Sequence, residues 1–476
     1  MARRIASIAS FFLSFALLQL LQRVASQPCP ANQPRAVRGY NSWDSDSNYV
    51  TEADILAAAT FLQSNLLKFG FDTITVDGGW YSNETHGAKW GANIIDAYGL
   101  PVPDVTRFPS SAGGKGFLPL AQQLNRMGLK LGAWTIRGIT PEAFAADLPI
   151  KGSTFTARDV GVPPSPTTSC SWDPNTMGTN APSAAADAWY ESLAKHYVAN
   201  GLELVKIDCM YASSSPQRYW WFEAEVESFA KAFAVQAPNV SISWSPGDNQ
   251  TPAAAALIAA HAPSWGKLYR ITGDFHDSEG IAALTQHLTT AAFFAPLIGA
   301  NASFPDLDML PFGQQAGTNG GLPRDNLFSP DEQRLIMTLW AITRAPLILG
   351  AVLPLAPDDN LTLSLFNEAV LDVNARSCRN VPTYVLPSGG STNTTALFAW
   401  TASAAEGDAM IVALFNVREE AASVSAASGV PGGCAIDVWT GVSEGALDDT
   451  GVLTRMLAPH SSGLWRVGAC TKAKAS

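Results

Sequence analysis

Short apolar runs alternate with amphipathic helical stretches from Arg35 to about Asn374, and this alternation constrains the fold more than any other feature of the chain. Alternating strands and helices are typical of βα units on a parallel sheet. We expect eight strands, near Ala36 to Asn41, Phe71 to Asp77, Leu129 to Ile136, Leu202 to Asp208, Val240 to Ser245, Leu268 to Thr272, Phe294 to Ile298 and Pro346 to Leu349. Eight strands separated by helices favour an α/β fold of the closed (β/α)8 barrel type over an open sheet.

The pattern changes beyond about Arg379, where residues alternate with a period of two and Gly, Ser and Pro clusters separate the runs. This spacing predicts a small antiparallel β-sandwich. Its strands are expected at Ala396 to Trp400, Met410 to Asn416, Ala435 to Trp439, Leu453 to Leu457 and Gly463 to Val467. The predicted domains are therefore a catalytic barrel over residues 27–378 and a sandwich over residues 379–476.

The first 26 residues are typical of a secretory signal peptide. Arg3 and Arg4 precede an apolar stretch from about Ile8 to Leu21, and small residues follow just before Gln27. The apolar stretch is too short and too interrupted for a membrane span, which needs about 20 residues. We expect cleavage near Gln27 and a secreted or extracellular protein, with the cell wall or a vacuole as further destinations.

Charge and composition exclude several classes of partner. Lys and Arg total 30 against 41 acids, for a net charge of −11, which argues against a nucleic-acid partner. The six cysteines show no CxxC spacing and the six histidines no HExxH pattern, so we expect neither a metal site nor a cofactor. An even cysteine number in a secreted chain suggests disulfides, whose connectivity the spacing leaves open. Six N-x-S/T sequons offer glycosylation sites, at Asn83, Asn239, Asn249, Asn301, Asn360 and Asn393.

Two aspartates end apolar runs of the predicted barrel and form a candidate catalytic pair. Lys206 and Asp208 share one face of their strand, and Arg270 and Asp274 share parity on theirs if that strand stays regular. Glycoside hydrolysis needs two carboxyl groups that flank one bond. The alternative is that each acid caps the next helix or pairs with a neighbouring cation.

Five motifs at the ends of predicted strands follow one another along the chain: Gly39-Tyr40-Asn41-Ser42-Trp43-Asp44, Val76-Asp77-Gly78-Gly79-Trp80, Lys206-Ile207-Asp208-Cys209, Tyr269-Arg270-Ile271-Thr272-Gly273-Asp274 and Pro305-Asp306-Leu307-Asp308-Met309-Leu310. Together they resemble glycoside hydrolase family 27, the α-galactosidase and α-N-acetylgalactosaminidase family, over roughly Arg35 to Gly350. Within the family, the chain is most similar to the plant branch described as β-L-arabinopyranosidase with α-galactosidase activity. The resemblance also implies a barrel followed by a β-sandwich.

The resemblance implies a retaining double displacement in which Asp208 is the nucleophile and Asp274 the general acid/base. Such a mechanism places the two carboxyl groups about 5 Å apart, one ionised and one protonated. Lys206 and Arg270 would position sugar hydroxyls, and the charge of Lys206 would favour the carboxylate of Asp208. The other substrate-binding residues that the resemblance implies are Trp43, Asp77, Trp134, Ser245 and Asp308.

Structural interpretations remain open for three of these residues. Asp77 is also suited to capping a helix, and Trp43 to packing in the barrel. Asp308 lies in a Pro-containing loop, where an acid often organises the backbone.

The resemblance also implies a disulfide between Cys170 and Cys209 at the rim of the site, although the cysteine of the family usually stands one position further from the nucleophile. Cys434 with Cys470 would then tie the sandwich, which leaves Cys29 and Cys378 to form a terminal link.

Two departures from the family pattern concern the substrate. Gly78 follows Asp77 where many α-galactosidases have a second acid, and Ser245 stands where they present a Glu toward the 2-position. The leading interpretation is an exo-glycosidase acting on galactose- or arabinopyranose-terminated oligosaccharides, glycans or arabinogalactan. An α-N-acetylgalactosaminidase, favoured by Ser245, and a carbohydrate-binding protein without catalysis are the alternatives.

Overall fold

The computed structural model describes residues 29–30, 32–83, 91–165, 168, 170, 172–215, 218–246, 252–316, 322–383 and 397–470. The predicted signal peptide lies outside the described residues. The chain divides into two compact units. One contains Ala36–Gln333 and Ala345–Phe366, and the other contains Arg334–Arg344 with the described residues before Ala36 and after Phe366. The predicted domain boundary after residue 378 stays a prediction, because these units reflect packing rather than chain order.

Eight parallel strands form the sheet of the first unit, in the order β10-β1-β2-β3-β4-β7-β8-β9. They are β1 (Arg38–Asn41), β2 (Thr73–Val76), β3 (Lys130–Ile136), β4 (Leu204–Asp208), β7 (Ser241–Ser245), β8 (Leu268–Arg270), β9 (Phe304–Asp306) and β10 (Leu347–Leu349). The two ends of this order meet just beyond β9. There the N–H of Leu310 donates to the carbonyl of Ile348 at 2.7 Å, and the N–H of Gly350 donates to that of Leu310 at 3.0 Å. The predicted (β/α)8 barrel is confirmed.

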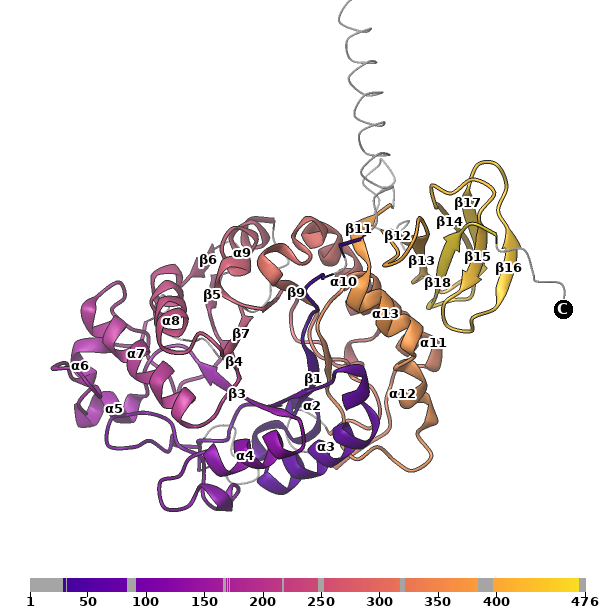
Figure 1. The fold of residues 1–476 in the computed structure, drawn as a ribbon. Helices are drawn as coiled ribbons and strands as arrows, with labels where there is room; N and C mark the ends of the chain where they lie inside the picture. The colour runs from indigo at the N-terminus through magenta and orange to yellow at the C-terminus, as the bar shows by residue number, and fades with distance from the viewer. Residues whose placement is uncertain are drawn as a thin grey trace, which may run out of the picture. The chain divides into compact units, whose positions relative to one another are not determined.

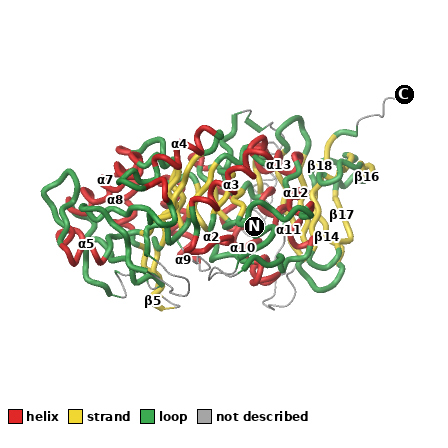
Figure 2. The backbone as a smooth tube through the Cα atoms, turned by 90° about the horizontal axis from the view of Figure 1, so that it is seen from below, coloured by secondary structure: helices red, strands yellow, loops and turns green. Residues whose placement is uncertain are grey.

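Helices surround these strands, as Figures 1 and 2 show. The longer ones are α3 (Glu52–Asn65), α4 (Leu118–Arg126), α7 (Ala184–Ala199), α8 (Glu223–Gln236), α9 (Pro252–Trp265) and α10 (Gly280–Phe294). Shorter ones are α2 (Trp43–Asp46), α5 (Pro141–Ala146), α6 (Ala157–Val160) and α12 (Asn360–Leu365). A hairpin of β5 (Tyr211–Ser215) and β6 (Arg218–Trp221) follows β4 and extends at one edge of this unit in Figure 2. Among the described residues, no helix combines the length and apolarity that a membrane span requires.

One predicted strand is wrong. Phe294 ends α10, and the residues Ala295–Leu297 form a 3-10 turn. The apolar residues there continue a helical stripe that buries Leu284, Leu288 and Ala291, so their period is that of a helix. The seventh strand of the barrel is instead β9, which begins ten residues after Phe294.

The second unit contains α11 (Pro330–Ile342) from Arg334 onward, α13 (Glu368–Arg376) and the C-terminal strands. A six-stranded sheet has the order β11-β12-β13-β18-β15-β16, and β14 pairs with β17. The strands are β11 (Cys378–Pro382), β12 (Leu397–Ser403), β13 (Met410–Asn416), β14 (Ala422–Ala427), β15 (Cys434–Asp437), β16 (Ser443–Ala446), β17 (Val452–Leu457) and β18 (Ser461–Gly468). Their core includes Val412, Leu414, Val424, Leu453 and Trp465. The antiparallel C-terminal domain is confirmed.

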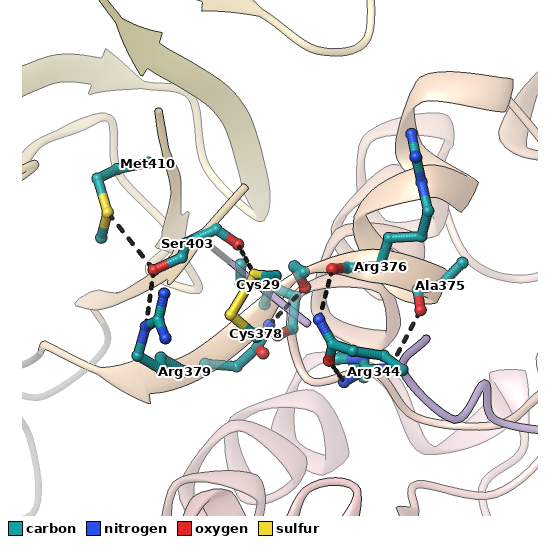
Figure 3. The surroundings of a disulfide bond; sticks show 12 residues. Cys29, Arg344, Ala375, Arg376, Cys378, Arg379, Ser403 and Met410 are labelled. Carbon is teal, nitrogen blue, oxygen red and sulfur yellow. Dashed lines mark hydrogen bonds between the residues drawn. A yellow bond between two sulfur atoms is a disulfide. The ribbon is translucent and has the colours of Figure 1, made fainter. Parts of the chain in front are cut away.

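A disulfide and a buried arginine hold the N-terminal segment within this second unit (Figure 3). Cys29 is bonded to Cys378. The guanidinium of Arg344 donates to the side chain of Gln33 at 2.7 Å and to the carbonyl of Pro34 at 2.6 Å. It also donates to the carbonyl of Ala375 at 3.0 Å. The segment before β1 is thus tied to residues more than 300 positions later in the chain.

Candidate active site

Side chains at the carboxyl ends of the barrel strands line one cavity of about 310 Å³. The register of β3 and β4 aligns Trp134 with Lys206 and Ile136 with Asp208. Trp134, Lys206 and Asp208 therefore lie toward the same end of the barrel, where parallel strands end. Both Asp208 and Asp274 line the cavity. So do six predicted substrate-binding residues: Trp43, Asp77, Trp134, Lys206, Arg270 and Asp308.

Asp77 lies at the buried side of the cavity with both carboxylate oxygens occupied. The ammonium group of Lys206 lies 2.7 Å from its Oδ2, and Asn41 Nδ2 donates to the same oxygen at 2.6 Å. The backbone N–H of Gly78 donates to Oδ1 at 2.8 Å. Burial on its own would lower the pKa of Lys206, but Asp77, Asp208 and Asp308 raise it above its usual range. This side of the cavity therefore presents a fixed pair of opposite charges.

Asp208 ends β4 and receives two hydrogen bonds. The indole N–H of Trp134 donates to Oδ2 at 3.1 Å, and the backbone N–H of Cys209 donates to Oδ1 at 2.7 Å. Burial raises the pKa of Asp208, while the charges of Lys206 and Arg270 oppose that rise. Trp134 therefore orients the carboxylate in addition to lining the cavity.

A disulfide lies directly beside Asp208. Cys209 is bonded to Cys170, and its backbone has a φ of 57°, in the left-handed region. The pairs Cys434 with Cys470 and Cys29 with Cys378 are also bonded, so all three expected pairings are present. Cys170 belongs to the loop after β3, and its bond fixes that loop to the end of β4.

Asp274 follows β8 and is the most exposed of the charged groups that line the cavity, with 63% of its side chain accessible. Arg270 Nη2 donates to its Oδ1 at 2.5 Å. The positive charge of Arg270 lowers the pKa of Asp274, and partial desolvation of the carboxyl group by the pocket opposes this effect only in part. Asp274 is therefore ionised in the unliganded protein.

Asp308 supports the loop that carries Asp274. Its Oδ2 accepts the backbone N–H of Phe275, the residue after Asp274, at 2.8 Å, and its Oδ1 lies 3.6 Å from Arg270 Nη1. Its own N–H donates to Asp306 Oδ1 at 2.9 Å, and its φ is 81°. Burial raises the pKa of Asp306 to about 7. This geometry agrees with the backbone-organising alternative for Asp308.

Ser245 does not line this cavity. It ends β7 opposite Asp208 and is 1% exposed. It borders a smaller cavity of about 30 Å³ that shares Lys206, Arg270 and Asp308 with the main one. Its role in substrate binding stays a prediction.

Three residues at or beside the site were not predicted from the sequence as site residues: His276 and Trp172, which line the cavity, and Asp44, which contacts His276. His276 lines the cavity, and its Nδ1 lies 3.3 Å from Oδ1 of the buried Asp44. Burial raises the pKa of Asp44 to about 6 against the effect of His276. Burial would lower the pKa of His276, but the carboxylate of Asp44 and the charges of Asp308 and Asp274 raise it to about 9. Asp44 follows Trp43 in the sequence and His276 stands two residues after Asp274, so both were close to predicted catalytic or substrate-binding residues. Trp172 had no such neighbour.

Curated relatives match the greater part of this chain, while no established family profile matches it. A probable α-galactosidase B from Neosartorya fischeri is 27% identical over 360 residues, which cover 70% of this chain and 66% of that protein. One from Aspergillus fumigatus is 26% identical over 358 residues and matches over 69% of its length. The chain thus spans about two thirds of these relatives.

Solved structures match over nearly the whole chain. A family 27 β-L-arabinopyranosidase from Geobacillus stearothermophilus has a TM-score of 0.82 and 30% identity, covering 93% of this chain and 98% of that one. A variant of that enzyme was solved in complex with arabinose. A putative α-N-acetylgalactosaminidase from Bacillus halodurans has a TM-score of 0.79 and 28% identity, covering 93% of this chain and all of that one. By fold, identity and coverage, this chain belongs to glycoside hydrolase family 27, the α-galactosidase-like family.

Proposed function

We propose that this protein is a retaining exo-glycosidase that removes terminal α-D-galactosyl residues and, in the same pocket, β-L-arabinopyranosyl residues. Asp208 attacks the anomeric carbon, and Asp274 protonates the departing oxygen and then activates water. The observation that carries the proposal is that both carboxylates, one at the end of β4 and the other on the loop after β8, line one pocket with Lys206 and Arg270. The two sugars differ by a hydroxymethyl group, so one pocket can accept both.

The proposed roles require a change in protonation when the substrate binds. In the unliganded protein, Arg270 keeps Asp274 ionised, whereas the proton donor must be protonated. A sugar hydroxyl that accepts from Arg270 would compete with Asp274 for this contact, and the bound sugar would exclude water from the carboxyl group. Both changes raise the pKa of Asp274. Asp208 keeps its two N–H donors and the nearby charge of Lys206, which stabilise its carboxylate.

Gly78 supports a pocket that accepts arabinopyranose. It lines the cavity beside Asp77, and a Cβ at this position would meet Asn48 Oδ1 at 3.3 Å and the Trp43 ring at 3.4 Å. Because glycine offers no carboxylate, a galactose hydroxymethyl group loses a partner there, while arabinopyranose has no such group.

The N-acetylgalactosaminidase alternative rests on Ser245 and on the similar protein from Bacillus halodurans. The cavity beside Ser245 is about 30 Å³, which is room for about one water molecule and not for an acetamido group. We therefore favour the galactosyl and arabinopyranosyl substrates.

We also propose that the protein is exported and acts on galactose- or arabinopyranose-terminated glycans outside the cytosol. Three disulfides support this, because such bonds persist in oxidising compartments.

A panel of nitrophenyl glycosides tests the proposed function. The purified protein should hydrolyse the α-D-galactopyranoside and the β-L-arabinopyranoside, and should leave the α-N-acetylgalactosaminide intact. Asp208→Asn should lower kcat by several orders of magnitude and preserve the circular dichroism spectrum. Preferential turnover of the acetamido sugar would favour the alternative enzyme. Binding of galactose without turnover of any glycoside would favour the non-catalytic protein.

A further inference from the structure

The side chains that line the pocket are buried on one side and exposed to solvent on the other, and this difference in exposure orients the substrate. Asp77, Trp134 and Arg270 are buried, whereas Asp274 has a 63% exposed side chain. If Asp274 protonates the departing oxygen, as proposed above, that oxygen lies at the exposed side. The cleaved sugar then fills the buried part of the pocket, and the leaving group extends outward past Asp274.

Trp172 is the other strongly exposed side chain of this lining, with 43% of its surface accessible. A tryptophan ring presents a large and rigid apolar face, and at the edge of a pocket this face is a surface on which a sugar ring can lie. Two described residues close to Trp172 in the chain have defined partners. Cys170 is bonded to Cys209, and the buried Asp173 accepts the backbone N–H of Asn175 at 2.7 Å.

Asn175 extends this anchoring. Its side chain donates to the carbonyl of Gly91 at 2.7 Å, and its own carbonyl accepts from Asn93 Nδ2 at 3.0 Å. The Trp172 ring is thus carried at the pocket mouth between a disulfide and a hydrogen-bonded turn.

We propose that Trp172 forms a binding site for the leaving group, and that this leaving group is itself a pyranose whose apolar face stacks on the indole ring. The inference rests on the proposed function and adds the residue that recognises the leaving group, so that a disaccharide or the end of a longer glycan is preferred over a small alkyl glycoside. Trp172 contacts the leaving group, while Asp77 and Lys206 face the terminal sugar that is released from it.

The test compares two α-galactosides whose leaving groups are both primary or simple alkyl alcohols: methyl α-D-galactopyranoside and galactose linked α-1,6 to a second hexose. Their demand for protonation is similar, so the comparison isolates contact with the leaving group. Trp172→Ala should lower kcat/KM for the disaccharide at least tenfold more than for the methyl glycoside, which corresponds to about 1.4 kcal/mol, because tryptophan is enriched among the side chains that carry most of the binding energy at an interface. Trp172→Phe, which keeps a smaller ring, should fall between wild type and Trp172→Ala.

Phe293→Ala is the matched control, because Phe293 is an exposed aromatic residue on α10 that does not line the cavity. It should leave the ratio of the two kcat/KM values at the wild-type level. Equal losses for both substrates in Trp172→Ala, or no loss for either, would overturn the leaving-group site.

A binding measurement separates this inference from the proposed function. Asp208→Asn, alone and combined with Trp172→Ala, is titrated with each sugar by calorimetry. The disaccharide should bind Asp208→Asn at least tenfold more tightly than the methyl glycoside, and the double variant should lose that difference. No turnover by wild type would contradict the proposed hydrolysis alone. Equal affinity for both sugars, or no binding of either, would contradict the leaving-group site.

Discussion

His276 and Asp44 place an ion pair beside the proposed catalytic acid, with 3.3 Å between Nδ1 and Oδ1. The pKa of His276 is raised to about 9, above the unfolded value of about 6.5. Protonation of His276 therefore stabilises the folded state fully below about pH 6.5, and this stabilisation is lost as the pH rises through about 9. Because the pKa of Asp44 is about 6, both partners are charged between about pH 6 and pH 9.

We expect Asp44→Asn to lower the pKa of His276, since the variant removes the carboxylate with which the imidazole forms its ion pair. Asp274 and Asp308 also face the imidazole and remain in place. An NMR titration of the histidine resonances in both proteins measures the change. An unchanged pKa in the variant would mean that these other acids, and not Asp44, hold the proton on His276.

Gly78→Asp tests how the pocket distinguishes its two proposed sugars. The new carboxylate is expected to bind the hydroxyls of galactose and to shift the ratio of kcat/KM toward the α-galactoside. A charge-assisted hydrogen bond contributes about 1.5–3 kcal/mol, or about ten- to a hundredfold. The side chain must fit beside Asn48 and Trp43, so Gly78→Ala controls for crowding. If both variants show the same ratio as wild type, the account of this position is wrong.

At the scale of elements, the loops after β8 and β9 depend on each other through Asp308. Its carboxylate accepts the N–H of Phe275, and its left-handed backbone suits Asn far better than Ala. We expect Asp308→Ala to lower the free energy of unfolding by about 1–3 kcal/mol, because a buried N–H loses its acceptor.

Asp308→Asn keeps an acceptor for Phe275, so it should retain most of the stability and more of the activity than Asp308→Ala. Chemical denaturation and kcat/KM on one aryl glycoside measure both effects. If Asn impairs activity as severely as Ala while the fold is stable, the charge of Asp308 acts on the substrate or on Arg270 rather than on the loop.

The strands and helices that could be predicted best from the sequence are those with a strong hydrophobic periodicity. Seven of the eight barrel strands lie where alternation placed them, and the error at Phe294 to Ile298 arose because an apolar run of five residues fits a strand or a helix end. The strand β14 was missed because its Ala-Ser-Val-Ser-Ala-Ala sequence alternates between small residues that differ little in polarity.

At the site, too, residues at the ends of regular strands were predictable from the sequence, whereas residues placed by long-range contacts of loops were not. Asp208 and Asp274 could be paired from the sequence because Asp208 ends one barrel strand and Asp274 follows another, and parallel strands end at one face of the barrel. Trp172 and His276 come from loops, whose placement depends on a disulfide and on the distant Asp44. No local pattern encodes such contacts.

At the scale of the whole molecule, the Cys29–Cys378 bond closes the longest loop in the chain among the three disulfides, with a separation of 349 residues. Removing a native disulfide typically costs about 2–5 kcal/mol. We expect the double variant Cys29→Ser and Cys378→Ser to unfold at a lower temperature in calorimetry, with kcat/KM near wild type at 25 °C. Loss of catalysis in a folded double variant would show that the pocket depends on this bond.

Asp208 and Asp274 are proposed to act in a double displacement, and the configuration of the first product shows whether they do. Two successive inversions at the anomeric carbon return the starting configuration. Proton NMR of a freshly started reaction with an aryl α-D-galactopyranoside should show α-D-galactose first, followed by slow mutarotation to the β form. If β-D-galactose appears first, water attacks the substrate directly and Asp208 is not the nucleophile.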